Sequence, residues 1–288
     1  MSKARTLVPK DGTQRPSSEV TLIPCKDEDQ RKNHISMHAV EGGTSVSDRE
    51  VVIVSPTYNE RENILPLICA LTNVLQGFEW EVLFVDDSSP DGTAALIREI
   101  ATSNHRVRLL ERIGRRGLSS ACIEGMLASS APFVAVMDAD LQHDECILPE
   151  MLRQLKSSSS DIIVGSRMIP GGSMGDVSIN RVLLSLVASQ LTRLACRCRI
   201  SDPMSGFFVV RRSFLEQFIS NVRGSGFKLL FDLLTASADP VKVAEVPYHF
   251  RKRKRGESKL NLLVEIEYLR LLAYKLLRRR SLRRAVAA

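Results

Sequence analysis

Short apolar runs alternate along the chain with longer segments whose apolar residues recur at every third or fourth position. An apolar run that ends in polar residues is typical of a buried parallel strand, and the longer period predicts a helix. The predicted strands are 51–54, 81–85, 107–110, 133–137, 161–164, 207–210 and 243–248. The predicted helices are 59–75, 93–102, 118–128, one from Pro149, 180–198, 213–220, 227–236 and 260–280.

This alternation of strands and helices predicts an α/β protein with a mostly parallel sheet and helices on both faces. Pro247 limits the last strand to an edge, because proline cannot donate a ladder hydrogen bond. The sequence has no Gly-x-Gly-x-x-Gly after the first strand and no P-loop motif, which disfavours both of those nucleotide-binding folds. Residues 1–49 are polar without periodicity, so we expect a disordered tail, a domain over 50–259 and a terminal helix over 260–288.

Charge is unevenly distributed along the 288 residues, whose 44% hydrophobic content is ordinary for a soluble globular protein. The net charge is +7, but residues 251–288 alone hold 13 Lys and Arg against 3 Asp and Glu. That local excess favours contact with an anionic membrane or a phosphate-bearing ligand. Nucleic acid is disfavoured, because only 5% of residues are aromatic and no recognition motif accompanies the charge.

The terminal helix has an apolar arc followed by arginines, a pattern that fits either packing on the body or a position in a bilayer interface. We expect peripheral attachment at the cytoplasmic face of a membrane, which would be the endoplasmic reticulum in a eukaryote or the inner membrane in a bacterium.

A polar motif directly follows the apolar run 133–137, namely Asp138-Ala139-Asp140-Leu141-Gln142. In extended backbone Asp138, Asp140 and Gln142 would point the same way. Three oxygen ligands at the carboxyl edge of a parallel sheet suit Mg²⁺ or Mn²⁺. The alternative is a solvated acidic loop, with the adjacent His143 as a surface or supporting residue.

Other polar residues also end predicted strands, which is difficult to explain without a ligand. Glu60 and Asp87 follow the first two strands, with helix capping as the alternative role. Arg167 follows the fifth, where a salt bridge is the alternative. Arg181 and Ser185 lie one turn apart on one face of a predicted helix.

Together these motifs resemble the family-2 glycosyltransferases with a GT-A fold, and most closely the dolichol- or polyprenyl-phosphate mannose synthases. The resemblance spans roughly Val51 to Leu277. Its motifs are Pro56-Thr57-Tyr58-Asn59-Glu60, Val85-Asp86-Asp87-Ser88-Ser89-Pro90-Asp91-Gly92-Thr93, Asp138 to Gln142, Gly165-Ser166-Arg167, Asp202-Pro203-Met204-Ser205-Gly206-Phe207-Phe208 and Gly256-Glu257-Ser258-Lys259-Leu260. The last of these and the spacing of Arg167, Arg181 and Ser185 point to the polyprenyl-phosphate branch.

The resemblance implies a role for each matching residue. The nucleotide base and ribose would be held by Pro56, Tyr58, Glu60, Val85 and Asp87. The metal on the donor diphosphate would be held by Asp138, Asp140 and Gln142, with Ala139 touching the nucleotide and Arg253 and Lys259 closing over the donor. The acceptor phosphate would be received by Arg167, Arg181 and Ser185. Those expected to act directly in catalysis are Asp140, Arg167 and Arg181.

The implied reaction is metal-dependent transfer of mannose from GDP-mannose to a dolichyl or polyprenyl monophosphate, with inversion at the anomeric carbon. A phosphate monoester is already ionised near neutral pH, so the nucleophile needs no dedicated base. UDP-glucose is the alternative donor. The resemblance also implies a small membrane-anchoring subunit as a partner. A hypothesis of another class is a non-catalytic module on a degenerate transferase fold, which binds a membrane or nucleic acid through its basic end.

Overall fold

The computed structural model describes residues 49–175, 190, 192, 195–196, 198–224, 226, 228–237, 239–253 and 272–275. All of them belong to one compact unit of the chain, Ala39–Ala288. Its strands are β1 (Val51–Thr57), β2 (Trp80–Asp86), β3 (Val107–Glu111), β4 (Phe133–Val136), β5 (Ile162–Ser166), β6 (Phe208–Arg211) and β7 (Val243–Pro247). Its α-helices are α1 (Arg61–Val74), α2 (Thr93–Ala101), α3 (Leu118–Leu127), α4 (Leu148–Ser157), α6 (Arg212–Phe218) and α7 (Leu229–Leu234), with 3₁₀ turns η2 (Glu145–Ile147) and η3 (Ile219–Asn221).

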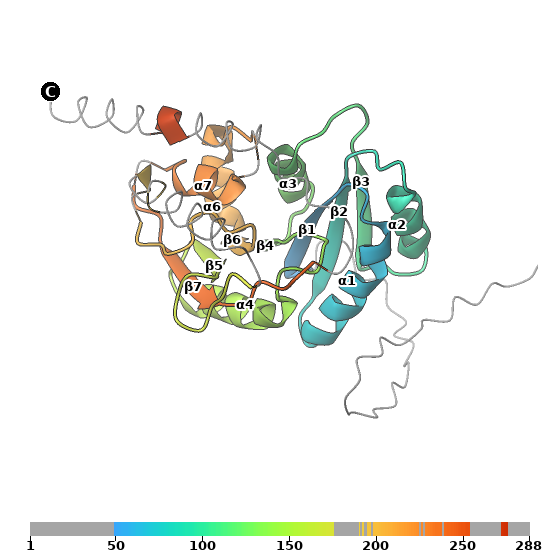
Figure 1. The fold of residues 1–288 in the computed structure, drawn as a ribbon, viewed down its shortest axis with the longest axis horizontal. Coiled ribbons are helices and arrows are strands. Elements are labelled where there is room, and N and C mark those ends of the chain that lie inside the picture. Colours follow the sequence, from blue (N-terminus) through green and yellow to red (C-terminus); the bar gives the residue numbers. More distant parts are fainter. Residues whose placement is uncertain are drawn as a thin grey trace, which may run out of the picture. The chain divides into compact units, whose positions relative to one another are not determined.

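The strands form one mixed sheet in the order β3-β2-β1-β4-β6-β5-β7 (Figure 1). β6 is antiparallel to both β4 and β5, whereas every other neighbouring pair is parallel. The predicted α/β architecture with a mostly parallel sheet is confirmed. β7 lies at the edge of the sheet, as its proline predicts.

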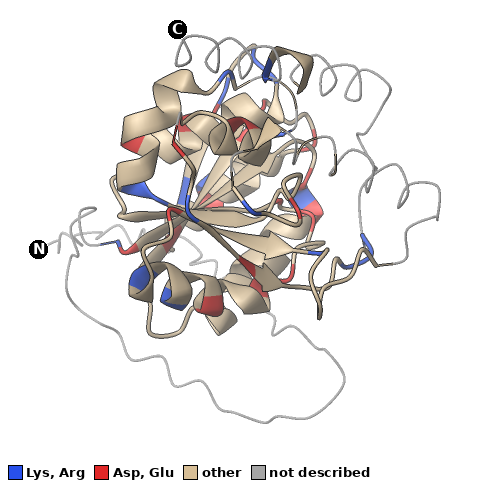
Figure 2. Cartoon of the chain, turned by 90° about the vertical axis from the view of Figure 1, so that its left-hand side faces the viewer, with Lys and Arg blue, Asp and Glu red and all other residues tan. Residues whose placement is uncertain are grey.

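Alternate residues of a strand point to opposite faces of the sheet. Because the strands are continuous apolar runs, both faces are apolar. In β1, Val52 and Val54 belong to one buried cluster and Val51 and Ile53 to another. The first cluster continues into α3, α6 and α7, and the second into α1, α2 and α4. Figure 1 shows α3, α6 and α7 on one side of the sheet and α1 and α4 on the other. Charged residues lie mainly on helices and loops, away from the strands that the two layers cover (Figure 2).

Two predicted helices lie mostly outside the described residues. Of the helix predicted over 180–198, Gln190, Thr192 and Ala195 are described and are helical. Of the terminal helix, residues 272–275 are described and are helical. There Leu272 belongs to the buried core, and Lys275 forms an ion pair with the buried Asp232 of α7, so this turn packs on the body.

A search of the described residues for a helix that is both long and apolar enough to cross a bilayer finds none.

Gly125 lets α3 lie close against β1 and β2. A β-carbon at this position would meet Val54 Cγ1 at 2.5 Å and Val85 Cγ2 at 2.8 Å. We therefore expect Gly125→Ala to lower the free energy of unfolding by about 1–3 kcal/mol through overpacking. This loss should appear although alanine favours a helix by about 1 kcal/mol over glycine.

Urea denaturation followed by circular dichroism would measure this change. Leu127→Ala, on the exposed face of the same helix, is the matched control and should change stability by about 0.5 kcal/mol or less. A Gly125→Ala protein as stable as wild type would show that α3 can shift away from the sheet at no cost.

Candidate active site

One edge of the sheet collects the polar strand ends that the sequence singles out. The carboxyl ends of β1, β2, β4 and β5 meet there because these strands run in the same direction. β6 runs the opposite way, so the segment 202–207 that leads into it reaches the same edge. The strand order reverses between β1 and β4, and open α/β sheets bind their ligands at such a point.

Loops at this edge hold backbone conformations that L-residues rarely adopt. Asn59 follows β1 with a φ of 57°, Ser88 follows β2 with 54°, and Leu141 follows β4 with 61°. Every other positive φ among the described residues belongs to glycine. Such conformations cost on the order of 1–3 kcal/mol and persist where surrounding contacts enforce them. Backbone strain in non-glycine residues is therefore concentrated at the edge that carries the candidate site.

The metal-ligand motif is a turn and does not have the extended backbone predicted from the sequence. β4 ends at Val136, and the left-handed Leu141 breaks the alternation of side chains. The turn still brings the carboxylates of Asp138 and Asp140 close together. Burial, followed by the charge of Asp138, raises the pKa of Asp140. The side chain of Asp140 is 5% exposed and that of Asp138 is 37% exposed, so the pair opens to solvent on one side.

Arg253 lies against two of the predicted metal ligands. Its Nη2 donates to Asp140 Oδ2 at 2.5 Å, and its Nε donates to Gln142 Oε1 at 3.2 Å. Gln142 Nε2 donates to the carbonyl of Arg251 at 3.0 Å, and Arg251 N donates to the Gln142 carbonyl at 2.9 Å. The basic segment 251–253 therefore lies directly across the motif.

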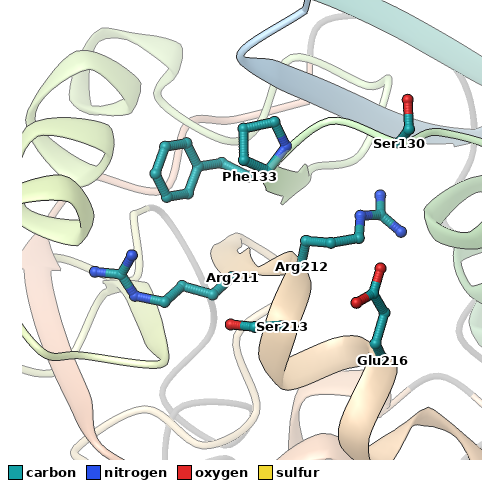
Figure 3. Close-up of a pocket in the computed structure, with 7 residues that line it drawn as sticks. Ser130, Phe133, Arg211, Arg212, Ser213 and Glu216 are labelled. Carbon is teal, nitrogen blue, oxygen red and sulfur yellow. The ribbon is translucent and has the colours of Figure 1, made fainter. Parts of the chain in front are cut away.

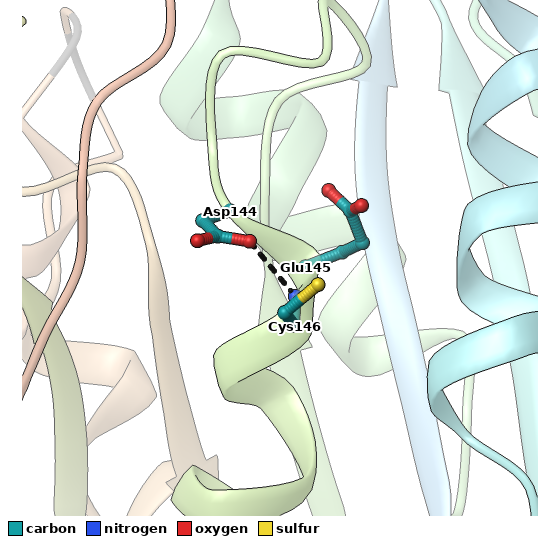
Figure 4. Close-up of side chains that lie close together, drawn as sticks. All are labelled: Asp144, Glu145 and Cys146. Atoms are coloured by element: carbon teal, nitrogen blue, oxygen red, sulfur yellow. Dashed lines mark hydrogen bonds between the residues drawn. The ribbon is translucent and has the colours of Figure 1, made fainter. Parts of the chain in front are cut away.

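An acidic cluster beside the motif anchors this segment. Figure 4 shows Asp144, Glu145 and Cys146 at the start of η2, where Asp144 Oδ1 accepts a hydrogen bond from Cys146 N at 3.1 Å. Their potential ligand atoms all lie within 4.8 Å of one another. Arg251 pairs with both carboxylates at 2.5 Å, so the cluster already has a cation and serves as an attachment point.

The predicted nucleotide side lies on β1 and β2. Pro56 and Val85 are register partners across these strands. Asp87 accepts hydrogen bonds from Arg112 Nη1 at 2.7 Å and from Gly117 N at 2.8 Å, which ties the end of β2 to the start of α3. Asp87 makes no capping hydrogen bond to α2, the helix that follows it in the sequence.

Tyr58 and Glu60 follow β1 at the same edge. Glu60 is buried and accepts a hydrogen bond from Asn63 Nδ2 at 2.7 Å, but its side chain makes no capping hydrogen bond to α1. The guanidinium carbon of Arg116 lies 4.3 Å from the centre of the Tyr58 ring. The capping alternative for Glu60 is therefore not observed.

Arg167 forms a buried salt bridge, as the alternative interpretation of this residue predicts. Its Nε and Nη2 donate to Asp202 at 2.7 Å and 2.9 Å, and Asp202 is completely buried. Glu245 of β7 in turn accepts hydrogen bonds from Ser201 N and Asp202 N at 2.7 Å and 3.0 Å. Within the described part of the chain, Asp202 is the side chain to which the Arg167 guanidinium donates its hydrogen bonds.

His143 is buried and contacts the backbone of the metal-ligand motif. Its Nδ1 accepts a hydrogen bond from Asp138 N at 3.1 Å, and its ring stacks on Phe207 with centroids 5.2 Å apart. Burial lowers the pKa of His143 to about 4, so the ring is neutral near pH 7. A neutral ring can accept the backbone hydrogen bond that orients Asp138.

The site residues differ in how far the sequence pointed to them. Asp202 lies in a motif quoted for the resemblance but was assigned no role there. Lys228 carried no sequence signal at all, yet it interacts electrostatically with Arg167, Asp202 and Asp138. Ala139 is buried within the turn. Three predicted site residues lie outside the described residues, namely Arg181, Ser185 and Lys259.

A cavity lies at the amino edge of the sheet, opposite the candidate site, and its two arginines have structural roles. It is lined by Ser130, Pro132, Phe133, Arg211, Arg212, Ser213 and Glu216 (Figure 3). Arg211 donates to the carbonyls of Ser158 and Ser160 after α4, and Arg212 donates to the carbonyl of Met126 in α3. Both guanidiniums thus bind carbonyls near helix C-termini, where positive charge is favourable.

The residues of the turn fit a hard divalent cation. Two carboxylates and an amide oxygen are suitable ligands for such an ion, and burial, followed by the charge of Asp138, raises the pKa of Asp140. Arg253 supplies positive charge beside Asp140 in the structure. The donor set therefore fits Mg²⁺ or Mn²⁺.

Comparison with known proteins identifies the family to which this chain belongs. Residues 52–219 match the family model for glycosyl transferase family 2, and the chain belongs to that family. Two relatives are dolichol-phosphate mannosyltransferases. That of Pyrococcus furiosus is 41% identical over 77% of this chain and 62% of its own length. That of Saccharomyces cerevisiae is 34% identical over 76% of this chain and 84% of its own length. The chain thus spans less than two thirds of the Pyrococcus protein.

Solved structures share the fold. Glucosyl-3-phosphoglycerate synthase from Mycobacterium tuberculosis, in complex with Mn²⁺, UDP and its product, superimposes with a TM-score of 0.59. It is 19% identical, and the match covers 84% of this chain and 86% of that one. A mannosyltransferase from Pyrobaculum calidifontis, in complex with GDP-mannose and Mn²⁺, gives a TM-score of 0.52 at 19% identity over 76% of this chain and 62% of its own. The predicted GT-A fold is confirmed.

The buried pair of Arg167 and Asp202 should contribute strongly to stability. We expect Asp202→Asn to lower the free energy of unfolding by about 3–5 kcal/mol, because the Arg167 guanidinium would lose its counter-charge inside the protein. Chemical denaturation at pH 7 would measure the loss. Glu111→Gln, in the exposed pair with Arg98, is the matched control and should cost about 1 kcal/mol or less. Equal effects of the two variants would contradict the importance of burial.

Proposed function

We propose that the protein transfers mannose from GDP-mannose to a dolichyl or other polyprenyl monophosphate, with inversion at the anomeric carbon. The observation that carries this proposal is the similarity to dolichol-phosphate mannosyltransferases at 41% and 34% identity over about three quarters of the chain. The geometry supports it, because an acidic turn suited to a metal–diphosphate lies at the same sheet edge as a buried arginine suited to a phosphate. A mannosyltransferase of the same fold has been solved with GDP-mannose and Mn²⁺.

Donor binding in this proposal uses the β1, β2 and β4 ends of the sheet. Pro56, Tyr58, Glu60, Val85 and Asp87 hold the base and ribose. Asp138, Asp140 and Gln142 would hold Mg²⁺ or Mn²⁺, which supplies positive charge to the departing diphosphate. Arg253 hydrogen-bonds to two of those ligands, so its guanidinium can turn to the diphosphate without travelling far.

The acceptor needs orientation more than activation. A phosphate monoester carries a nucleophilic oxygen anion near pH 7, so no side chain has to remove a proton. Arg167, held rigidly by Asp202, binds that phosphate and aligns it for in-line attack on the anomeric carbon. A single direct displacement inverts the anomeric centre, so an α-linked donor gives a β-linked product. Arg181 and Ser185 are the further acceptor contacts expected from the resemblance, as is Lys259 over the donor.

The lipid acceptor also requires access to a membrane. We place the protein at the cytoplasmic face of a membrane through its basic carboxyl end, alone or with a small membrane subunit. The charge excess over 251–288 supports this arrangement.

The first experiment compares donors. The protein is incubated with Mn²⁺, a polyprenyl phosphate in detergent, and either GDP-mannose or UDP-glucose, and the lipid fraction is analysed for glycolipid. We expect product from GDP-mannose. Product only from UDP-glucose would keep the mechanism and replace the sugar, and product from neither donor would contradict the proposed reaction for this chain alone.

Asp140 is the most direct test of the metal site. We expect Asp140→Ala to reduce transfer at least about a hundredfold, because charge on the leaving diphosphate would no longer be neutralised by a correctly held ion. In a thermal-shift assay, wild type should be stabilised by GDP only when Mn²⁺ is present, and the variant should lose that stabilisation.

Asp239→Ala removes an exposed carboxylate away from this edge and is the matched control. It should behave as wild type in both assays. Retention of metal-dependent GDP stabilisation by Asp140→Ala would contradict the assignment of Asp140 as a metal ligand.

A further inference from the structure

Arg251 is the residue at which the chain after β7 passes onto the loop that follows β4. Before it, Phe250 is held by a residue beyond β5, because Phe250 N donates to the Ser173 carbonyl at 2.9 Å. At Arg251 the partner changes. Its N–H donates to the Gln142 carbonyl at 2.9 Å, and its own carbonyl accepts a hydrogen bond from Gln142 Nε2 at 3.0 Å. These bonds attach the segment 251–253 to the loop that carries the metal-ligand motif.

The side chain of Arg251 attaches the segment to the same loop a second time. Its Nη1 donates to Glu145 and its Nη2 to Asp144, each at 2.5 Å, so one planar guanidinium binds two neighbouring carboxylates. The Glu145 side chain is 11% exposed, and a carboxylate withdrawn from water needs a counter-charge, which Arg251 supplies. We call Arg251 and these two carboxylates the clasp.

Arg253 follows the clasp in the sequence and reaches the motif itself. Its Nη2 donates to Asp140 Oδ2 at 2.5 Å, and its Nε donates to Gln142 Oε1 at 3.2 Å. An arginine side chain has several rotatable bonds and can exchange these partners for a ligand, provided that its backbone stays beside the motif. The clasp fixes that backbone, because Arg251 is bound to the loop through both its main chain and its side chain.

We propose that Arg251 is a positioning residue for the donor, which acts by keeping Arg253 within reach of the diphosphate of a bound nucleotide. The inference rests on the proposed function and adds to it the clasp, which belongs to none of the motifs that carry the family resemblance. Arg251 itself is occupied by Asp144 and Glu145, so its effect on the donor passes through Arg253. A diphosphate is common to GDP and UDP, and the clasp should therefore serve a donor with either base.

A double-mutant cycle separates this positioning role from general structural support. Isothermal titration with GDP and with UDP, each in the presence of Mn²⁺, would compare wild type, Arg251→Gln, Arg253→Gln and the double variant. We expect Arg251→Gln to weaken binding of the preferred nucleotide about three- to tenfold, a modest loss because the clasp is partly exposed. In the Arg253→Gln background the same change should have little effect, because the residue that the clasp positions is gone.

Two further variants calibrate the binding series. Arg251→Lys keeps the charge but not the planar fork, so it should retain part of the affinity. Arg153→Gln removes an exposed ion pair with Glu150 on α4 and is the matched control, which should bind as wild type does.

Hydrogen exchange reads the clasp without any ligand. Glu145→Gln should speed exchange in the peptide that contains Arg251, whose amide donates to the loop, and Arg153→Gln should not. In the transfer assay, Arg251→Gln should raise the KM for the nucleotide sugar and leave the KM for the acceptor unchanged, because Arg167 is held by Asp202 and not by the clasp.

The outcomes distinguish the clasp from the proposed function. Unchanged nucleotide binding by Arg251→Gln would overturn the inference, as would an equal loss in the presence and absence of Arg253, or unchanged exchange in Glu145→Gln. If wild type binds a nucleoside diphosphate but transfers no mannose, the proposed function fails, while the cycle still decides the role of the clasp. Binding of neither nucleotide by wild type would overturn both.

Discussion

Two carboxylates held close together at the end of β4 set the conditions for the rest of the site. Asp140 is buried, and this burial, followed by the charge of Asp138, raises the pKa of Asp140. Arg253, which lies 113 residues later in the chain, pairs with Asp140 and offsets the cost of this burial. Arg251 fixes the same segment to Asp144 and Glu145, just after the turn. The acidic turn and the basic segment therefore behave as one electrostatic unit.

The other part of the site, around Arg167, is organised by a buried positive charge. Asp202 accepts two side-chain hydrogen bonds from Arg167, and Glu245 holds the backbone of Asp202 in place. This chain of contacts ties β5, the entry to β6, and β7 together. The result is an arginine whose guanidinium is held in a fixed direction. A carboxylate-rich half and a half built on a buried arginine meet at one sheet edge, which suits the proposed joining of two anionic substrates.

Stability and strain occupy different parts of the molecule. Two apolar clusters cover the two faces of the sheet, and the amino edge uses Arg211 and Arg212 to bind helix-end carbonyls. Among the residues that the structure describes, those other than glycine with a left-handed backbone lie at the carboxyl edge. A rigid core can hold such loops in unfavourable conformations, and that keeps the functional groups in place before any ligand binds.

Local patterns were sufficient for the strands and helices that the structure describes and for the motifs that indicate the family. Strand and helix positions follow from hydrophobic period, because burial on a sheet or against a helix repeats every two or every three to four residues. The polar residues after β1, β2, β4 and β5 were also visible, since the ends of parallel strands share one edge. The prediction of extended backbone through Asp138–Gln142 was wrong. The left-handed conformation of Leu141 depends on tertiary contacts, which the hydrophobic pattern of the sequence does not contain.

Only the tertiary structure decided which charges meet. Asp202 and Arg167 are 35 residues apart in sequence, and Arg253 and Asp140 are 113 apart. The tertiary structure also decided the contacts of Glu60 and Asp87 and the burial of His143. These depend on how α3 and the 251–253 segment pack around the edge. The physical reason is that the state of an ionisable group depends on burial and on neighbouring charges in space, whereas hydrophobic period depends on neighbours along the chain.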